Sequence, residues 1–238
     1  MISERTFAER YTSFWHQCLP MGEEVTDSIN KHAEAMGDAL RASDEEVRED
    51  LVSELGLRWF GARVAEGRLS SREPRKADLQ KIESEVTAFI GRLRGSPTPE
   101  LPPPSAAETD AAKGMAEMLV TFVRTWEYEQ AIVARPPFVG CGLLAACRGD
   151  LLVGHTLYEV KAVEKGFRQP HIRQLVTYCA LNFASPAYDI RRIGLINPRK
   201  GIYFRSDLEW IVQLLSGQES AGLFHEILDF VSTERISA

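Results

Sequence analysis

The sequence predicts a mixed α+β and α/β protein in two parts, a helical N-terminal module and a C-terminal mixed β-sheet flanked by helices. Apolar residues recur at helical spacing through most of residues 1–95. Five prolines follow between residues 97 and 104, which excludes a helix there and favours an extended spacer. Beyond residue 106, strand-like runs and helical patterns alternate. We therefore expect domains at residues 1–95 and 106–238, joined by a proline-rich linker at residues 96–105.

The N-terminal module contains three expected helices. The first covers about residues 3–18, and the second begins at a capping box of Ser43 and Glu46 and runs to about residue 67. The third covers residues 76–94. Their apolar stripes are typical of packed helices, and the net charge of −7 over residues 1–110 repels a polyanion. We expect this module to mediate assembly, with a second copy of the chain or with a partner protein.

The C-terminal region begins with an expected helix from Thr109 and Asp110 to about Tyr128. A strand is expected within residues 138–147, followed by a hairpin of residues 151–153 and 156–160. The remaining expected elements are a helix at 169–183, strands at 190–197 and 201–204, and helices at 207–215 and from 220 onward.

The hairpin has a two-residue loop that begins with Gly154, which is typical of a tight turn. Counting back from this loop along the two strands places Asp150 opposite Glu159. Directly opposed residues have Cβ atoms roughly 4.5–5.5 Å apart, and like charges there are unfavourable. The spacing therefore predicts that a cation lies between the two carboxylates.

Lys161 shares a strand face with Glu159, because side chains alternate along a strand. Two acids and a lysine on one face favour a Mg²⁺ or Mn²⁺ site that hydrolyses a phosphodiester. Asp150 and Glu159 provide hard oxygen ligands, and the backbone carbonyl of Val160 is the expected third. We expect Lys161 to orient the metal-bound water or to stabilise the charge that develops on the phosphate.

These residues resemble the PD-(D/E)xK nuclease superfamily, with Asp150 on one strand and Glu159-Val160-Lys161 on the next. Gln174 and Tyr178 match the Q-x-x-x-Y motif of the RecB-like branch, on a helix that follows the Glu-x-Lys strand. The resemblance covers about residues 138–197. It implies a restriction-endonuclease-like core, DNA as substrate, and a site in which Gln174 and Tyr178 contact the substrate backbone or the catalytic lysine. It also implies a role within a restriction or phage-defence complex.

The same branch often adds an acid or a histidine from an upstream helix. Glu117, Glu127 and Glu129 are the candidates here, and the helical pattern favours Glu129. His171 lies near Arg168 at the start of the Q-x-x-x-Y helix, where contact with phosphate is one option and simple exposure is the stronger expectation.

The bulk properties set further limits. Residues 111–238 carry a net charge of only +1, so tight autonomous DNA binding is not expected. No apolar run approaches a membrane span, no signal peptide is evident and the four cysteines suit reduced thiols, so we expect a cytoplasmic location. Two alternatives to a DNA nuclease stay open: an RNA nuclease, and a non-catalytic nuclease fold that serves as a scaffold or nucleic-acid sensor.

Overall fold

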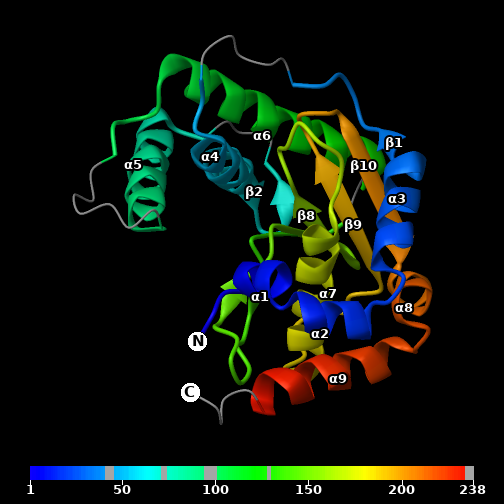
Figure 1. Cartoon of the computed structure of the whole chain (residues 1–238). Helices are drawn as coiled ribbons and strands as arrows, with labels where there is room; N and C mark the ends of the chain where they lie inside the picture. The colour runs from blue at the N-terminus through cyan, green and yellow to red at the C-terminus, as the bar shows by residue number, and fades with distance from the viewer. Residues whose placement is uncertain (41–45, 71–73, 94–100, 128–129, 234–238) are drawn as a thin grey trace.

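The computed structural model describes the chain except for residues 41–45, 71–73, 94–100, 128–129 and 234–238. A mixed six-stranded β-sheet runs through the described part, and helices cover both of its faces (Figure 1). This confirms the predicted class of a mixed sheet flanked by helices. No helix within the described ranges is both long and apolar enough to cross a membrane.

The strands of this sheet are antiparallel to their neighbours except for one parallel pair, β8 with β9. In spatial order they are β1 (Glu34–Ala35), β10 (Ile202–Asp207), β9 (Arg192–Asn197), β8 (Thr156–Val160), β7 (Leu151–Val153) and β4 (Ile132–Ala134). Two small strand pairs accompany it: β2 (Val64–Ala65) with β3 (Arg68–Leu69), and β5 (Pro137–Phe138) with β6 (Cys147–Arg148).

One hydrophobic core lies on each face of the sheet. The helices that contribute to the first core are α1 (Glu4–Arg10), α2 (Thr12–Cys18), α3 (Gly22–His32), α7 (Gln169–Ala184), α8 (Leu208–Ser216) and α9 (Ser220–Thr233). Those of the second core are α4 (Glu49–Ala62), α5 (Lys76–Leu93) and α6 (Ala106–Trp126).

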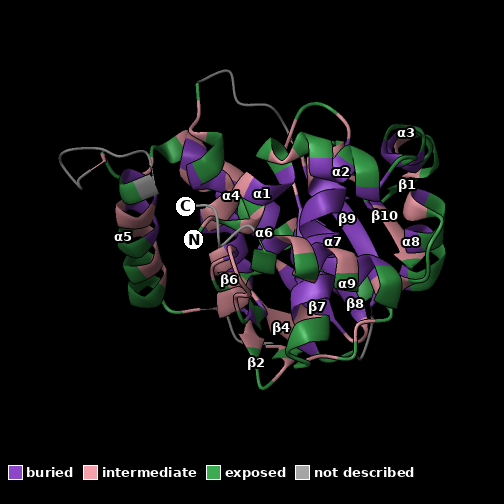
Figure 2. Cartoon of the chain, turned by 60° about the horizontal axis from the view of Figure 1, so that its bottom comes forward, coloured by how far each residue is buried: buried purple, intermediate pink, exposed green. Residues whose placement is uncertain are grey.

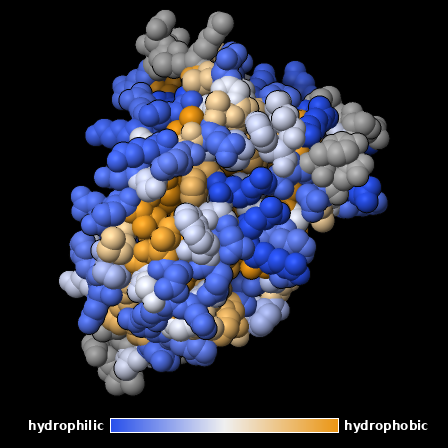
Figure 3. Space-filling model, turned by 90° about the vertical axis from the view of Figure 1, so that its right-hand side faces the viewer, coloured by the Kyte–Doolittle hydropathy of each residue, from blue (hydrophilic) through white to orange (hydrophobic). Residues whose placement is uncertain are grey.

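Neighbouring parallel strands need a crossover connection. Helix α7 provides it between β8 and β9 and passes over the first face of the sheet. It is buried from His171 to Leu181, with the other helices of this face packed around it (Figure 2). The crossover brings the first turns of α7 next to the end of β8. On the side of the molecule where α3 and α8 lie, the surface carries apolar side chains between hydrophilic ones (Figure 3).

The N-terminal and C-terminal parts of the chain share both cores. Helix α1 packs against α7, α4 packs against α6, and β1 adds to the sheet edge beside β10. Each core contains residues from before and after the proline-rich segment. The division into domains at residues 96–105 therefore stays a prediction.

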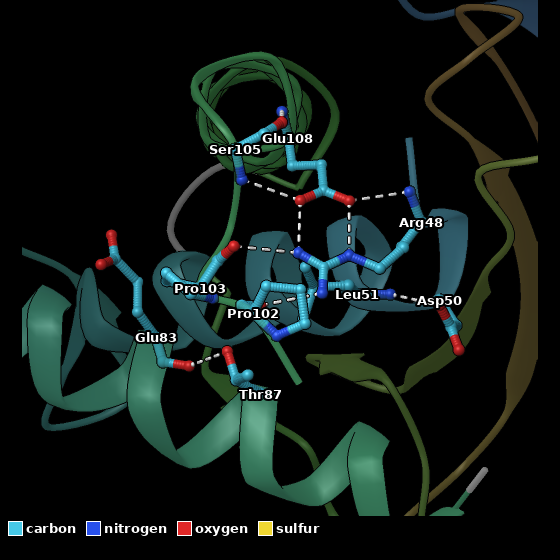
Figure 4. Close-up of polar contacts among 9 residues, drawn as sticks. All are labelled: Arg48, Asp50, Leu51, Glu83, Thr87, Pro102, Pro103, Ser105 and Glu108. Carbon is cyan, nitrogen blue, oxygen red and sulfur yellow. Dashed lines mark hydrogen bonds and ion pairs between the residues drawn. The ribbon is translucent and has the colours of Figure 1, made fainter. Parts of the chain in front are cut away.

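Arg48 fixes the described end of the proline-rich segment (Figure 4). Its guanidinium donates to the Glu108 carboxylate from Nε (2.7 Å) and Nη2 (2.6 Å), and to the carbonyl oxygens of Pro102 (2.9 Å) and Pro103 (3.1 Å). Glu108 also accepts from the backbone N–H of Ser105, which caps α6. This cluster joins the beginnings of α4 and α6 to the segment between them.

Three predicted helices begin or continue differently in the structure. The helix expected over residues 3–18 is interrupted at Tyr11, and its first half, α1, is capped by Ser3. Helix α6 begins at Ala106 and not near Thr109, because Ser105 and Glu108 form a capping box.

The helix expected from Ser43 begins only at Glu49, since residues 46–48 are not helical. Ser43 itself lies outside the described residues. The same helix, α4, ends at Ala62 because the chain turns into the β2–β3 pair, where Glu66 and Gly67 have positive φ.

The strand predicted within residues 138–147 was wrong. Only its two ends pair with each other, as β5 and β6, and the segment between them is irregular. The sheet strand that pairs with β7 is β4, which lies before this segment.

Candidate functional site

The predicted hairpin and its register are present. Val153 lies opposite Thr156 and Leu151 opposite Tyr158, and Gly154 occupies the turn with a φ of 56°. Glycine suits this position because other residues rarely adopt positive φ. Asp150 immediately precedes β7, so the next step of this register falls at Glu159.

Asp150 is held in place by the backbone of the neighbouring strand. Its Oδ2 accepts a hydrogen bond from the Val160 N–H at 2.8 Å, and its own carbonyl accepts from the Arg135 N–H at 2.9 Å. The side chain therefore lies beside the end of β8, where Glu159 and Lys161 project from the face that α7 covers.

Glu159 is the most informative group of the site. It is 1% exposed, and its Oε1 pairs with the Lys161 Nζ at 2.6 Å. Its Oε2 is buried and has no hydrogen-bond partner among the described residues while Asp150 is ionised, whereas a protonated Asp150 carboxyl can donate to the Glu159 carboxylate. A buried, unpartnered carboxylate oxygen is costly, and a divalent cation held beside Asp150 would relieve that cost.

The titration behaviour of the three groups agrees with this geometry. Burial, followed by the charge of Glu159, raises the pKa of Asp150 to about 8. Burial also raises the pKa of Glu159, although the Lys161 charge opposes it. For Lys161, burial lowers the pKa, but the Glu159 and Asp150 charges outweigh burial and leave the pKa above its usual value.

The donor set fits a divalent cation that prefers oxygen ligands. Asp150 and Glu159 supply carboxylates, and Val160 lines the same cleft. Within the described ranges, no group of three or more His, Cys, Asp or Glu side chains is arranged to hold a metal. The candidate site is therefore the carboxylate pair, which main-chain and substrate oxygens would complete.

Helix α7 adds the two predicted residues of the Q-x-x-x-Y motif. Gln174 is 4% exposed and lines the cleft, and Tyr178 is 2% exposed. Burial raises the pKa of Tyr178, and the negative charges of Glu159, Asp150 and Glu4 act in the same direction. The structure thus brings all five predicted site residues together.

Glu4 is a member of the site that sequence reasoning missed. It stands in the first turn of α1, where burial raises its pKa and its own backbone N–H and the Lys161 charge lower it. Helix α1 is anchored by Phe7, which contacts the rings of Trp15 and Phe230. No sequence signal connects residue 4 with residue 159, because the contact depends on the packing of α1 against α7.

Glu117 and Glu127 were predicted as upstream acids of the site, but the structure places both elsewhere. Glu117 is exposed and pairs with Arg63 at 3.0 Å. Glu127 is buried, accepts from the Tyr158 hydroxyl and pairs with Arg205 at 2.6 Å. Tyr158 and Glu159 are neighbours on β8, so their side chains point to opposite faces of the sheet. Glu127, which contacts Tyr158, therefore lies on the face away from Glu159. Glu129 lies outside the described residues.

A cleft of about 490 Å³ is lined by Asp150 and Lys161, next to the buried Glu159. One side carries basic groups and the other side, formed by α4 and α5, carries acidic and apolar ones. The first side carries Arg5, Lys161 and Arg168, with the neutral His171 and with Glu9, which pairs with Arg5 at 3.0 Å. The opposite side includes Glu49, Asp50, Glu54, Leu57, Phe89 and Ile90. Figure 1 shows α4 and α5 above α1, the helix that carries Arg5.

A comparison with models of known protein families found no match. A comparison with curated protein sequences also found no similar sequence. The functional conclusion therefore depends on the residues and their geometry.

Proposed function

We propose that this protein is a metal-dependent nuclease that hydrolyses phosphodiester bonds in DNA. The observation that carries the proposal is a pair of acids beside a cleft. Asp150 lines the cleft, and the buried Glu159 next to it has one oxygen without a described partner and the other 2.6 Å from the Lys161 Nζ. A cleft with one basic side suits a polyanionic strand.

The carboxylate pair would hold Mg²⁺ or Mn²⁺, with the Val160 carbonyl as a further ligand. When bound, such an ion polarises a phosphate and lowers the pKa of its water. The backbone N–H of Val160 fixes Asp150, so this carboxylate needs little reorganisation.

Lys161 would act as a cation and hydrogen-bond donor. Its raised pKa keeps the side chain protonated near neutral pH, so it suits charge stabilisation better than proton abstraction. Gln174 lines the same cleft, and Tyr178 is buried one turn further along α7. Both would position the substrate or Lys161, as the resemblance implies.

Glu4 takes the place that was expected for an acid from α6. The charges of Lys161 and Asp150 act on it, so it adds a further carboxylate near the pair, as Glu54 on α4 does. Because α1 supplies Glu4 and α4 forms part of the cleft, we propose that the N-terminal residues help to build the site. Their role in assembly, with a second copy or with a partner of a defence complex, is a separate prediction.

The test is a cleavage assay on linear, circular and single-stranded DNA and on RNA, with and without Mg²⁺. Wild-type protein should cut DNA only with the metal, and Asp150→Ala should not cut. Asp189→Ala is the matched control, because Asp189 is exposed and pairs with Arg191 away from the cleft. Cleavage of RNA alone would change the substrate class. Absence of cleavage on every substrate would favour a scaffold or a nucleic-acid sensor.

A further inference from the structure

His171 was expected to be exposed, but it is 3% exposed and lines the cleft. Its Nδ1 accepts a hydrogen bond from the backbone N–H of Arg168 at 3.2 Å. A neutral imidazole that accepts at Nδ1 carries its proton on Nε2. Among the described residues, nothing hydrogen-bonds to that Nε2–H, so this cleft-lining ring has a donor without a partner.

Gln174 lies one turn further along α7 than His171. It too is buried and lines the cleft, and its side-chain amide makes no hydrogen bond to any described residue. Both side chains belong to the first turns of a 16-residue helix, where the backbone dipole favours an anion.

The charges around His171 are also suited to an anion. Arg5, Arg168 and Lys161 line the same cleft, although Arg5 pairs with Glu9 at 3.0 Å and Lys161 with Glu159 at 2.6 Å. Burial and these three cations lower the pKa of His171 to about 3, so the ring is a neutral donor at physiological pH. Arg168 is exposed and has no ion-pair partner in the described part of the chain.

We propose that His171 and Arg168 form a phosphate-binding subsite beside the carboxylate pair, in which the Nε2–H of His171 donates to a phosphate oxygen of the bound strand. This inference depends on the proposed function for its substrate. The ligand chemistry is that of a phosphate, and it has two sources: an internal phosphodiester next to the scissile one, or a phosphate at the end of a strand.

The experiment measures binding separately from cleavage. Fluorescence anisotropy in Ca²⁺ gives the Kd of short single-stranded DNA oligonucleotides with hydroxyl ends, with a 5′-phosphate or with a 3′-phosphate. The variants are His171→Leu, His171→Gln and Arg168→Gln, with Arg191→Gln as an exposed control arginine away from the cleft. Thermal unfolding checks each fold, and Arg168→Gln is a surface change that remains testable if His171→Leu does not fold. Cleavage in Mg²⁺ is measured in parallel.

A lost hydrogen bond to a charged group corresponds to about a tenfold or larger rise in Kd, which we expect for His171→Leu and Arg168→Gln. His171→Gln keeps a donor amide and should stay within about threefold of wild type, and Arg191→Gln within about twofold. A loss with all oligonucleotides identifies an internal phosphodiester, and a loss only with end-phosphorylated ones identifies a terminal phosphate.

Two results would overturn the subsite: Kd values for Arg168→Gln and folded His171→Leu that equal wild type, or no binding of any oligonucleotide by wild-type protein. If wild-type protein cleaves normally but the Kd values do not change, the nuclease proposal stands and the subsite fails. If the Kd values change as expected but nothing is cleaved, the subsite stands and the nuclease proposal fails.

Discussion

Asp150→Asn should change how the stability of the metal-free protein depends on pH. The native pKa of Asp150 is raised from 3.8 to about 8. Between these values the native state holds a proton that the unfolded state has released. The native state therefore binds more protons, and the free energy of unfolding falls as pH rises through this window. The asparagine side chain cannot titrate, so the variant should lose this part of the slope.

The structure bounds the size of the effect. One proton contributes at most about 1.4 kcal/mol per pH unit. For a chain of this size, that corresponds to an upper limit of roughly 3–5 °C in Tm per pH unit. Asp150 is partly exposed, so the measured value should be smaller. Glu159 has a raised pKa as well, so Asp150→Asn should reduce the slope without removing it.

The assay is thermal unfolding in EDTA between about pH 5 and pH 8, where the raised pKa of Asp150 acts. Asp189→Asn is the control, because a hydrogen bond from Arg191 lowers the pKa of Asp189 and its titration ends below this window. The reasoning is refuted if Asp150→Asn and wild type have the same slope. It is also refuted if Asp189→Asn flattens the slope to the same extent.

Three further changes test other parts of the account. Lys161→Met keeps an apolar stem and removes the charge, so the single-turnover cleavage rate should fall about a hundredfold or more while the circular dichroism spectrum is unchanged. Tyr178→Phe removes only the hydroxyl of a buried ring, and the same assay should show a loss of about tenfold or less. Arg48→Ala leaves the buried Glu108 carboxylate without its guanidinium partner, so the free energy of unfolding in urea should fall by roughly 2–4 kcal/mol. The control Lys81→Ala changes an exposed ion pair and should lower it by less than about 0.5 kcal/mol. Equal values for these two variants would contradict the structural role of Arg48.

The sequence predicted the parts of the site that depend on local rules. The hairpin register follows from a two-residue loop and the alternation of strand side chains, so Asp150 and Glu159 could be placed opposite each other. Gln174 and Tyr178 lie four residues apart on one helix, which places them on one face.

The sequence did not predict the positions of Glu4, Glu127 and His171, because these positions depend on contacts between distant segments. Glu4 reaches the site because aromatic packing holds α1 against α7, and no periodicity reports such a contact. Glu127 was one of the upstream candidates, but contacts with Tyr158 and Arg205 hold it on the other face of the sheet. The burial of His171 follows from the same packing, since its position near the start of a helix does not by itself imply exposure.

The most direct test of the central claim is a crystal structure of the protein soaked in Mn²⁺, with the metal located by anomalous scattering. We expect one peak that contacts a carboxylate oxygen of Asp150 and the Oε2 of Glu159 at about 2.0–2.4 Å. A well-occupied Mn²⁺ bound elsewhere, with no peak between these two carboxylates, would contradict the proposed metal site.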